Sequence, residues 1–119
     1  MGATPEQRLL IMKRIVITKN EGKGVRWFNA DQATMYPGCL YFLGKIAFSK
    51  STDSTESHES LYLTKHDTWI LREYDTDNLS RASYSVISKN EAAKWFVKNE
   101  YEDKDIPFSV LDNVMNLEL

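Results

Sequence analysis

The sequence is poor in the residues from which most small catalytic and metal sites are built. One cysteine, Cys39, and two histidines stand among 119 residues. A single cysteine cannot form an intramolecular disulfide, and so few soft ligands do not make a dedicated zinc site. No glycine-rich segment has the spacing of a phosphate-binding loop, and Gly-x-Ser-x-Gly is missing. We therefore assign no catalytic residue, no metal ligand and no cofactor, and the chain is a poor candidate for an enzyme.

Long hydrophobic runs are also missing. No apolar stretch approaches the roughly 20 residues that cross a bilayer. The apolar residues 9–12 are followed at once by Lys13 and Arg14, which reverses the order of a secretion signal. We expect a cytoplasmic protein with no membrane partner.

Neither sign of charge dominates, since fifteen basic and seventeen acidic residues leave a net charge of −2. This balance excludes a surface that is basic throughout, as a general nucleic-acid or membrane binder has. The distribution is uneven, however. Residues 1–50 hold eight basic and three acidic groups (+5), and residues 51–119 hold seven and fourteen (−7), which together return −2. The asymmetry indicates a polarised surface with a charged partner, or two faces that are simply solvated.

What the sequence does have is 42% hydrophobic and 12% aromatic residues, enough for one globular domain with its own core. We predict a single α+β domain: an antiparallel sheet, made of an N-terminal hairpin and a C-terminal meander, with short helices packed on one face. The hairpin covers residues 14–28, and the meander strands cover residues 61–65, 68–74 and 82–87. Helices are expected at residues 5–12, at residues 30–36 behind an Asn29 cap, from the Ser88 capping box to residue 99, and after Pro107.

Two intervening segments are expected to differ sharply. Residues 39–48 are aromatic and aliphatic, and this composition predicts a buried strand. Residues 49–60 contain five serines, two threonines and no apolar side chain. Such a segment gains little from burial, so we predict a mobile Ser/Thr-rich loop.

Alternation along the meander predicts which side chains lie inside. Leu61, Leu63, Trp69 and Leu71 share one face, and we expect this face to hold the core. Ile70, Arg72 and Tyr74 then point the other way. If nothing covers that second face, Arg72 and Tyr74 are candidate binding residues, because arginine and tyrosine are enriched in binding hot spots.

The N-terminal hairpin supplies the other candidate binding residues. Lys19, Lys23 and Arg26 lie close to Trp27 in the sequence. Basic groups interleaved with an aromatic side chain can hold a phosphate backbone or an acidic patch on a protein. The alternative is structural, since lysines on edge strands discourage edge-to-edge pairing.

The C-terminal half carries a pattern of short motifs. In order these are Leu61-Tyr62-Leu63-Thr64, Trp69-Ile70-Leu71, Ile87-Ser88, Glu91-Ala92, Trp95-Phe96 and Asn99. This pattern resembles a family of short uncharacterised bacterial and phage proteins with a Leu-Tyr-x-Thr strand, a Trp-x-Leu strand and an Ile-Ser-x-x-Glu-Ala-x-x-Trp helix start. The family often has a glycine-rich turn where this chain has His66-Asp67-Thr68. The resemblance covers residues 61–99 and implies a bacterial or mobile-element accessory protein with no known activity.

These observations favour a non-enzymatic protein-binding or regulatory module. With a phage or plasmid setting, a specific form of this hypothesis is an inhibitor of a host defence complex. One alternative is a nucleic-acid-associated regulator that uses the basic hairpin. A second is a small enzyme, which would need Cys39 beside His66 or several acids gathered in a pocket. A homodimer through an exposed sheet face or edge stays open.

Overall fold

The computed structural model describes residues 13–20 and 22–119, with the backbone alone at residues 78–80. The helix expected over residues 5–12 lies outside this part of the chain. The strands are β1 (Arg14–Val16), β2 (Trp27–Asn29), β3 (Thr34–Pro37), β4 (Leu40–Leu43), β5 (Ile46–Ser49), β6 (Ser57–Leu63), β7 (Trp69–Asp75) and β8 (Asn78–Ile87). The helices are η1 (Ala30–Gln32), α2 (Lys89–Lys98), η2 (Asp103–Asp105) and α3 (Phe108–Met115).

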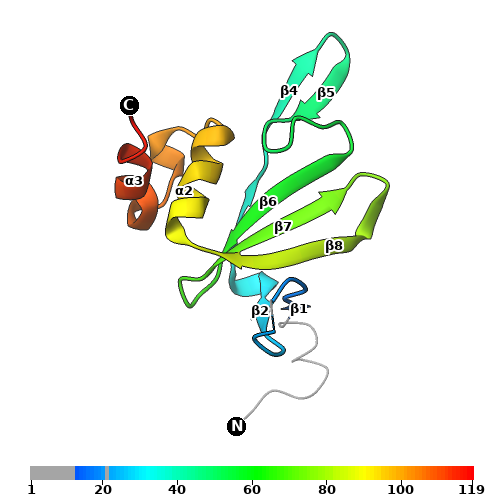
Figure 1. Ribbon diagram of the computed structural model, residues 1–119, viewed down its shortest axis with the longest axis vertical. Coiled ribbons are helices and arrows are strands. Elements are labelled where there is room, and N and C mark those ends of the chain that lie inside the picture. The colour runs from blue at the N-terminus through cyan, green and yellow to red at the C-terminus, as the bar shows by residue number, and fades with distance from the viewer. Residues whose placement is uncertain (1–12, 21) are drawn as a thin grey trace.

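The centre of the molecule is a four-stranded antiparallel sheet in the order β3-β6-β7-β8. Two separate two-stranded hairpins, β1-β2 and β4-β5, accompany it (Figure 1). The predicted α+β class, the N-terminal hairpin and the antiparallel meander are confirmed. β6 and β8 are longer than predicted, whereas β7 keeps its predicted length of seven residues. The turn between β7 and β8 is tight, since Asp75 pairs with Asn78.

The helices cover one face of this sheet. Trp69 is 2% exposed and meets Phe96 of α2 edge-to-face, with ring centroids 5.6 Å apart. Leu61 and Val110 complete this core and are fully buried. The inner face predicted from strand alternation is therefore confirmed. The capping box is also confirmed, since the Ser88 side chain accepts a hydrogen bond from the Glu91 backbone N–H.

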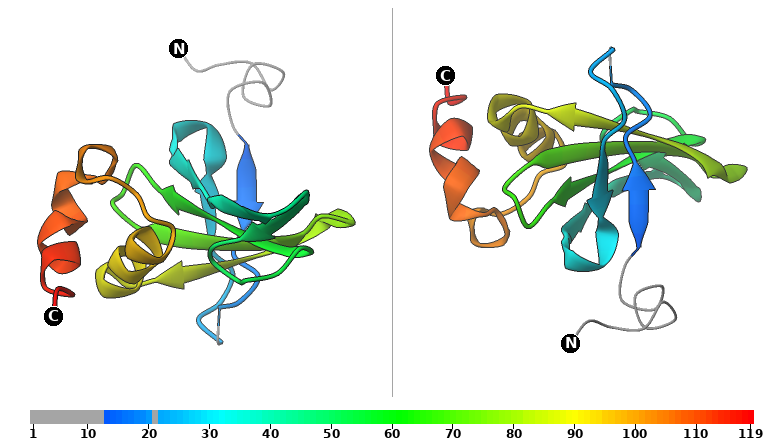
Figure 2. Two further views of the ribbon diagram at one scale, coloured as in Figure 1. Left: turned by 90° about the horizontal axis from the view of Figure 1, so that it is seen from above. Right: turned by 90° about the horizontal axis from the view of Figure 1, so that it is seen from below.

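The β1-β2 hairpin covers part of the opposite face. Ile17, Phe28 and Ile70 form a second buried cluster, each no more than 6% exposed. The hairpin runs across the strands of the sheet (Figure 2) and then continues beside β8. There the backbone N–H groups of Thr18 and Lys19 both donate to the Tyr84 carbonyl, at 3.1 and 3.0 Å. The hairpin thus covers part of one face of the four-stranded sheet and part of its β8 edge.

A buried amide joins the end of α2 to the start of the β4-β5 hairpin. Asn99 has no exposed surface, and its Oδ1 accepts from the Cys39 backbone N–H at 3.0 Å and the Ser51 hydroxyl at 2.9 Å. Its Nδ2 donates to the Trp95 carbonyl at 2.9 Å. Each polar atom of the amide is therefore satisfied, which is the condition for burying it without a large cost.

The helix predicted over residues 30–36 is wrong beyond its first turn. Asn29 caps η1 as expected, since its Oδ1 accepts from the Asp31 N–H at 3.0 Å. Three residues later the chain enters β3, where Met35 pairs with Tyr62. Pairing with β6 satisfies the backbone groups of this segment, and this tertiary interaction overrides the local helix signal.

The single buried strand predicted over residues 39–48 is also wrong. The segment folds into β4 and β5 around Gly44, whose φ of 64° suits a residue without a side chain. The hairpin projects away from the sheet (Figure 1). Leu40 and Ile46 are exposed, whereas Tyr41 and Phe48 are half-buried and stack on each other. Phe42 is 64% exposed and Leu43 is 63% exposed. Hydrophobic composition did not distinguish a core strand from a projecting arm.

The serine-rich segment is shorter as a loop than predicted, because Ser57–Leu63 form β6. Ser49 and Ser51 are buried, and hydroxyl hydrogen bonds replace the missing apolar contacts within the turn. The mobility of this loop stays a prediction.

The last helix forms where predicted, after Pro107. At its start Phe108 is 93% exposed, whereas Val110 lies in the core.

We expect Trp69→Ala to lower the free energy of unfolding by about 3–5 kcal/mol, because it leaves a cavity between the sheet and α2. Chemical denaturation measures this loss. The matched control is Phe108→Ala, an aromatic truncation at an exposed position, which should change stability by less than about 0.5 kcal/mol. Equal losses for the two variants would contradict the assigned core.

Candidate ligand-binding groove

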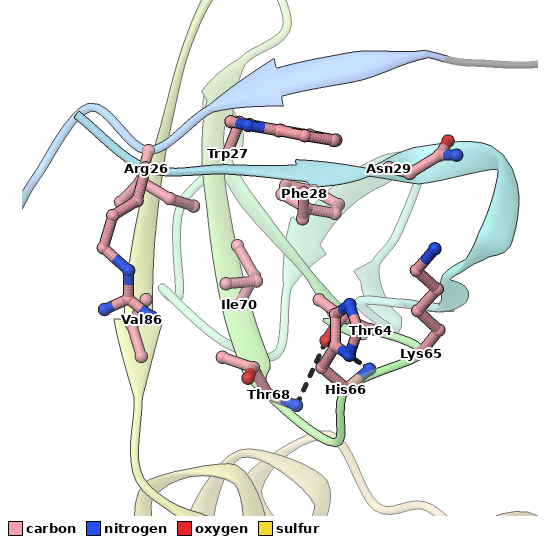
Figure 3. A pocket seen from close by; sticks show the side chains of 11 residues that line it. Arg26, Trp27, Phe28, Asn29, Thr64, Lys65, His66, Thr68, Ile70 and Val86 are labelled. Carbon is pink, nitrogen blue, oxygen red and sulfur yellow. Dashed lines mark hydrogen bonds between the residues drawn. The ribbon is translucent and has the colours of Figure 1, made fainter.

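A groove of about 380 Å³ lies between the β1-β2 hairpin and the turn that joins β6 to β7 (Figure 3). Its floor is apolar and consists of Ile17, Phe28 and Ile70. Arg26 stands at one side and Lys65 and His66 stand at the other, all three exposed. The groove therefore combines an apolar floor with a basic rim.

Strand alternation in β2 creates two different surfaces from neighbouring aromatic residues. Phe28 points into the molecule, where its ring lies 5.2 Å from the Tyr62 ring and 5.9 Å from the Tyr84 ring. Burial on this sheet face raises the pKa of the Tyr62 hydroxyl. Trp27 points the other way and is 48% exposed, with the Arg14 guanidinium 4.4 Å from the centre of its ring. Trp27 thus presents an accessible aromatic ring, covered by a cation, on the outer side of the hairpin, while its strand position borders the groove (Figure 3).

The β6-β7 turn fixes the opposite rim. The Thr64 hydroxyl accepts from the backbone N–H groups of His66 and Thr68, at 3.3 and 3.2 Å (Figure 3). Asp67 completes the turn in the left-handed region, with φ 59°. This hydrogen-bonded turn was predicted at His66-Asp67, and it holds Lys65 and His66 beside the groove.

The charge of the groove has one sign. Among the described residues, its lining includes Arg26, Lys65 and His66 but no carboxylate. The acids of residues 100–118 belong to the segment of α3 and η2 that packs on the helix side of the sheet. The basic residues of the groove and the acidic residues of the C-terminal segment therefore lie on different sides of the molecule. An occupant of the groove would meet hydrophobic contacts below and positive charge at the sides.

The structure divides the predicted binding residues among three places. Arg26 and Trp27 line the groove. Lys19 and Lys23 line an adjoining hollow of about 420 Å³, which Arg26 also borders. Lys19 already has an acidic partner, since its Nζ lies 3.0 Å from Glu73 Oε1.

Arg72 and Tyr74 lie further along β7 and do not line this groove. Their face of the sheet is the one that the hairpin covers at Ile70. Both side chains are half-buried.

Sequence reasoning missed half of the groove. Lys65 was interpreted only as the end of a strand and Phe28 only as a strand residue. His66 was considered as a turn residue and as a partner for Cys39 in an enzyme, but not as a binding residue. Alternation correctly separated Ile70 from Trp69. No local signal, however, says which turn of the sheet the hairpin will approach, because that depends on contacts between Phe28 and Ile70, which are distant in sequence.

The arrangement does not assemble the thiol site that a small enzyme would need. Antiparallel pairing places Thr34 beside Leu63 and Pro37 beside Ser60. Cys39 therefore lies toward the opposite end of β6 from His66. Among the described residues, no group of three or more His, Cys, Asp or Glu side chains is placed to hold a metal ion. No described helix has the length and apolar character needed to span a bilayer.

Comparison of the chain with protein-family models, with curated proteins and with solved structures gave no match. The family resemblance of residues 61–99 therefore stays an expectation from short motifs. The chemistry of the groove must be interpreted from its own residues.

The exposure of Trp27 gives a direct test of the orientation of β2, which places Phe28 inside and Trp27 outside. Trp69 and Trp95 are only 2% and 6% exposed, so we expect Trp27 to account for most of the fluorescence that acrylamide quenches. Trp27→Phe should remove that quenchable component and leave the protein folded by circular dichroism. Unchanged quenching in this variant would show that Trp27 is covered.

Proposed function

We propose that the protein is a non-enzymatic binding module that recognises an acidic peptide segment of a partner protein in the groove beside the β1-β2 hairpin. The observation that carries this proposal is the apolar floor bordered by cations, with no carboxylate among its described lining residues. An apolar side chain of the peptide fills the floor, and a neighbouring Asp or Glu pairs with the rim.

The size and residue types of the groove support a peptide ligand. A volume of about 380 Å³ lies at the small end of the ~300–1,000 Å³ typical of ligand pockets and suits one or two side chains. Trp27 and Arg26 belong to the residue types that dominate binding energy at protein interfaces. The buried position of Ile70 gives an anchor side chain a fixed apolar surface.

Nucleic acid fits the same geometry less well. Trp27 offers a ring for base stacking, and Arg14, Arg26 and Lys65 offer contacts to phosphates. Against this, Lys19 is paired with Glu73, and the whole chain carries a net charge of −2. The one aromatic ring of the groove floor, Phe28, is only 5% exposed and gives bases no open surface for stacking. We therefore place nucleic-acid binding second and make it an outcome of the test.

The biological setting of the proposal comes from the motif resemblance alone. It implies a bacterial or mobile-element accessory protein. Inhibition of a host defence complex is the most specific form of this setting. The residues of the groove specify the partner only by its chemistry: it is a protein with an exposed segment that contains acidic and apolar side chains.

Selection from a random-peptide display library tests the proposal without knowledge of the partner. We expect enriched peptides to pair Asp or Glu with Leu, Phe or Trp. Fluorescence polarisation of a labelled enriched peptide should then show that Arg26→Glu weakens binding by about tenfold or more, because it reverses a charge on the rim. Lys104→Glu is the matched control, since Lys104 is an exposed lysine of η2 and lies outside the groove lining. It should leave affinity unchanged.

Labelled single-stranded DNA and RNA of mixed sequence supply the competing result. Tight binding of these probes, lost steeply with rising salt and weakened by Arg26→Glu, would replace the peptide proposal with the nucleic-acid one. Enriched peptides that bind Arg26→Glu and the unmodified protein equally would contradict a role for the groove.

A further inference from the structure

The outer half of the hairpin-side sheet face holds a second group of polar and aromatic side chains. His58 and Ser60 of β6 lie opposite Tyr74 and Arg72 of β7 in the strand register. Alternation places all four on the face away from the helices, since Leu61 and Leu71 face the helix core. The hairpin covers Ile70 but leaves Arg72 and Tyr74 half-exposed.

Stacking holds Arg72 in one position. Its guanidinium carbon lies 4.2 Å from the centre of the Tyr74 ring, and the His58 ring lies 5.7 Å from the same ring. Tyr62 neighbours Ser60 on the same face of β6, and burial raises the pKa of its hydroxyl while the positive charge of Arg72 opposes that rise. A stacked guanidinium loses little further freedom when it binds a planar partner.

Three buried polar atoms in this group have no hydrogen-bond partner among the described residues. They are Arg72 Nε, Ser60 Oγ and His58 Nε2. Ser60 is only 3% exposed. A buried polar group without a partner costs about 1–3 kcal/mol, so three of them on two adjacent strands call for an explanation. The Arg72 Nε–H can only donate and the Ser60 hydroxyl is able to donate, so one acceptor would satisfy both atoms.

No described carboxylate on this face supplies that acceptor. Glu59 and Glu73 alternate onto the helix side of the sheet, where Glu73 pairs with Lys19. Among the described residues, the Arg72 side chain has neither an ion pair nor a hydrogen bond. A hollow of about 220 Å³ adjoins His58 and Tyr74 next to this group and gives room for a ligand of several atoms. Leu40 and Glu59 also line this hollow, whereas Arg72 and Ser60 lie beside it.

We propose that Arg72, Ser60 and Tyr74 form a binding site for an oxyanion, a carboxylate or phosphate carried on an organic group. The Arg72 fork donates to two oxygens of the anion, as guanidinium groups do with carboxylates and phosphates. The Ser60 hydroxyl donates to the same group. The tyrosine rings and the hollow beside His58 contact the carbon part of the ligand. This site shares no residue with the groove and does not depend on the proposed function.

Nuclear magnetic resonance of the ¹⁵N-labelled protein tests the site, because the Arg72 Nε–Hε signal reports on the orphaned atom. The probes are benzoate, phenyl phosphate, inorganic phosphate and benzamide. We expect saturable shifts of this signal with benzoate and phenyl phosphate at millimolar concentrations, where a ligand with one charged contact binds. Benzamide is the neutral isostere of benzoate and should give none. Weaker shifts with inorganic phosphate would assign part of the affinity to the organic group, and equal shifts would assign the site to the free ion.

Variants separate binding at Arg72 from a general effect on the fold. Ser60→Ala removes one donor, and Arg72→Lys keeps the charge but removes the fork. Shifts at neighbouring backbone amides should show about tenfold weaker benzoate binding for Arg72→Lys. Tyr74→Phe keeps the stacking ring and should bind normally. Lys104→Gln is the control, since it removes a positive charge at an exposed lysine of η2 that lies outside the hollows beside His58 and Tyr74. The absence of a saturable Arg72 shift with all three anions would overturn the site, as would benzoate affinity retained in both Arg72→Lys and Ser60→Ala.

Discussion

The start of β7 must be buried on both faces of the sheet, and the rest of the structure follows from this constraint. Trp69 and Ile70 are neighbours in sequence, point in opposite directions, and are each 2% exposed. Removing one such side chain from water contributes about 1.5–3 kcal/mol, so both faces need a cover. The C-terminal helices cover Trp69, and the N-terminal hairpin covers Ile70. The N-terminal hairpin and the C-terminal helices, which are far apart in sequence, thus bury the two faces of the same strand.

The two covers differ in extent, and this difference creates the surfaces on which function is proposed. The hairpin is shorter than the strands it crosses, so it buries Ile70 and leaves Arg72 and Tyr74 half-exposed. Where its edge approaches the β6-β7 turn, the groove remains between them. The apolar floor of the groove therefore consists of the same residues, Ile17, Phe28 and Ile70, that form the buried cluster under the hairpin. A binding surface of this kind is rigid because the contacts that form it also hold the fold together.

The sequence predicted well those features that depend on neighbouring residues. Alternation placed Trp69 and Ile70 on opposite faces, and the Ser88 capping box located the start of α2. Features that depend on distant partners were missed. Residues 30–36 contain a good helix cap, yet pairing with β6 makes most of them a strand. Arg26 and Trp27 were recognised as site residues, but Lys65 and His66 were not, because only tertiary packing brings the β6-β7 turn to the hairpin.

The central claim is that a partner peptide occupies the space between the hairpin and the β6-β7 turn. Amide hydrogen exchange, measured with and without a peptide enriched by display, tests this claim most directly. With the peptide bound, we expect slower amide hydrogen exchange in β2 (Trp27–Asn29) and in residues 64–68, and little change in α3 (Phe108–Met115). Protection confined to α3 or to the β4-β5 hairpin would contradict it, because the peptide would then bind a surface that the groove does not touch.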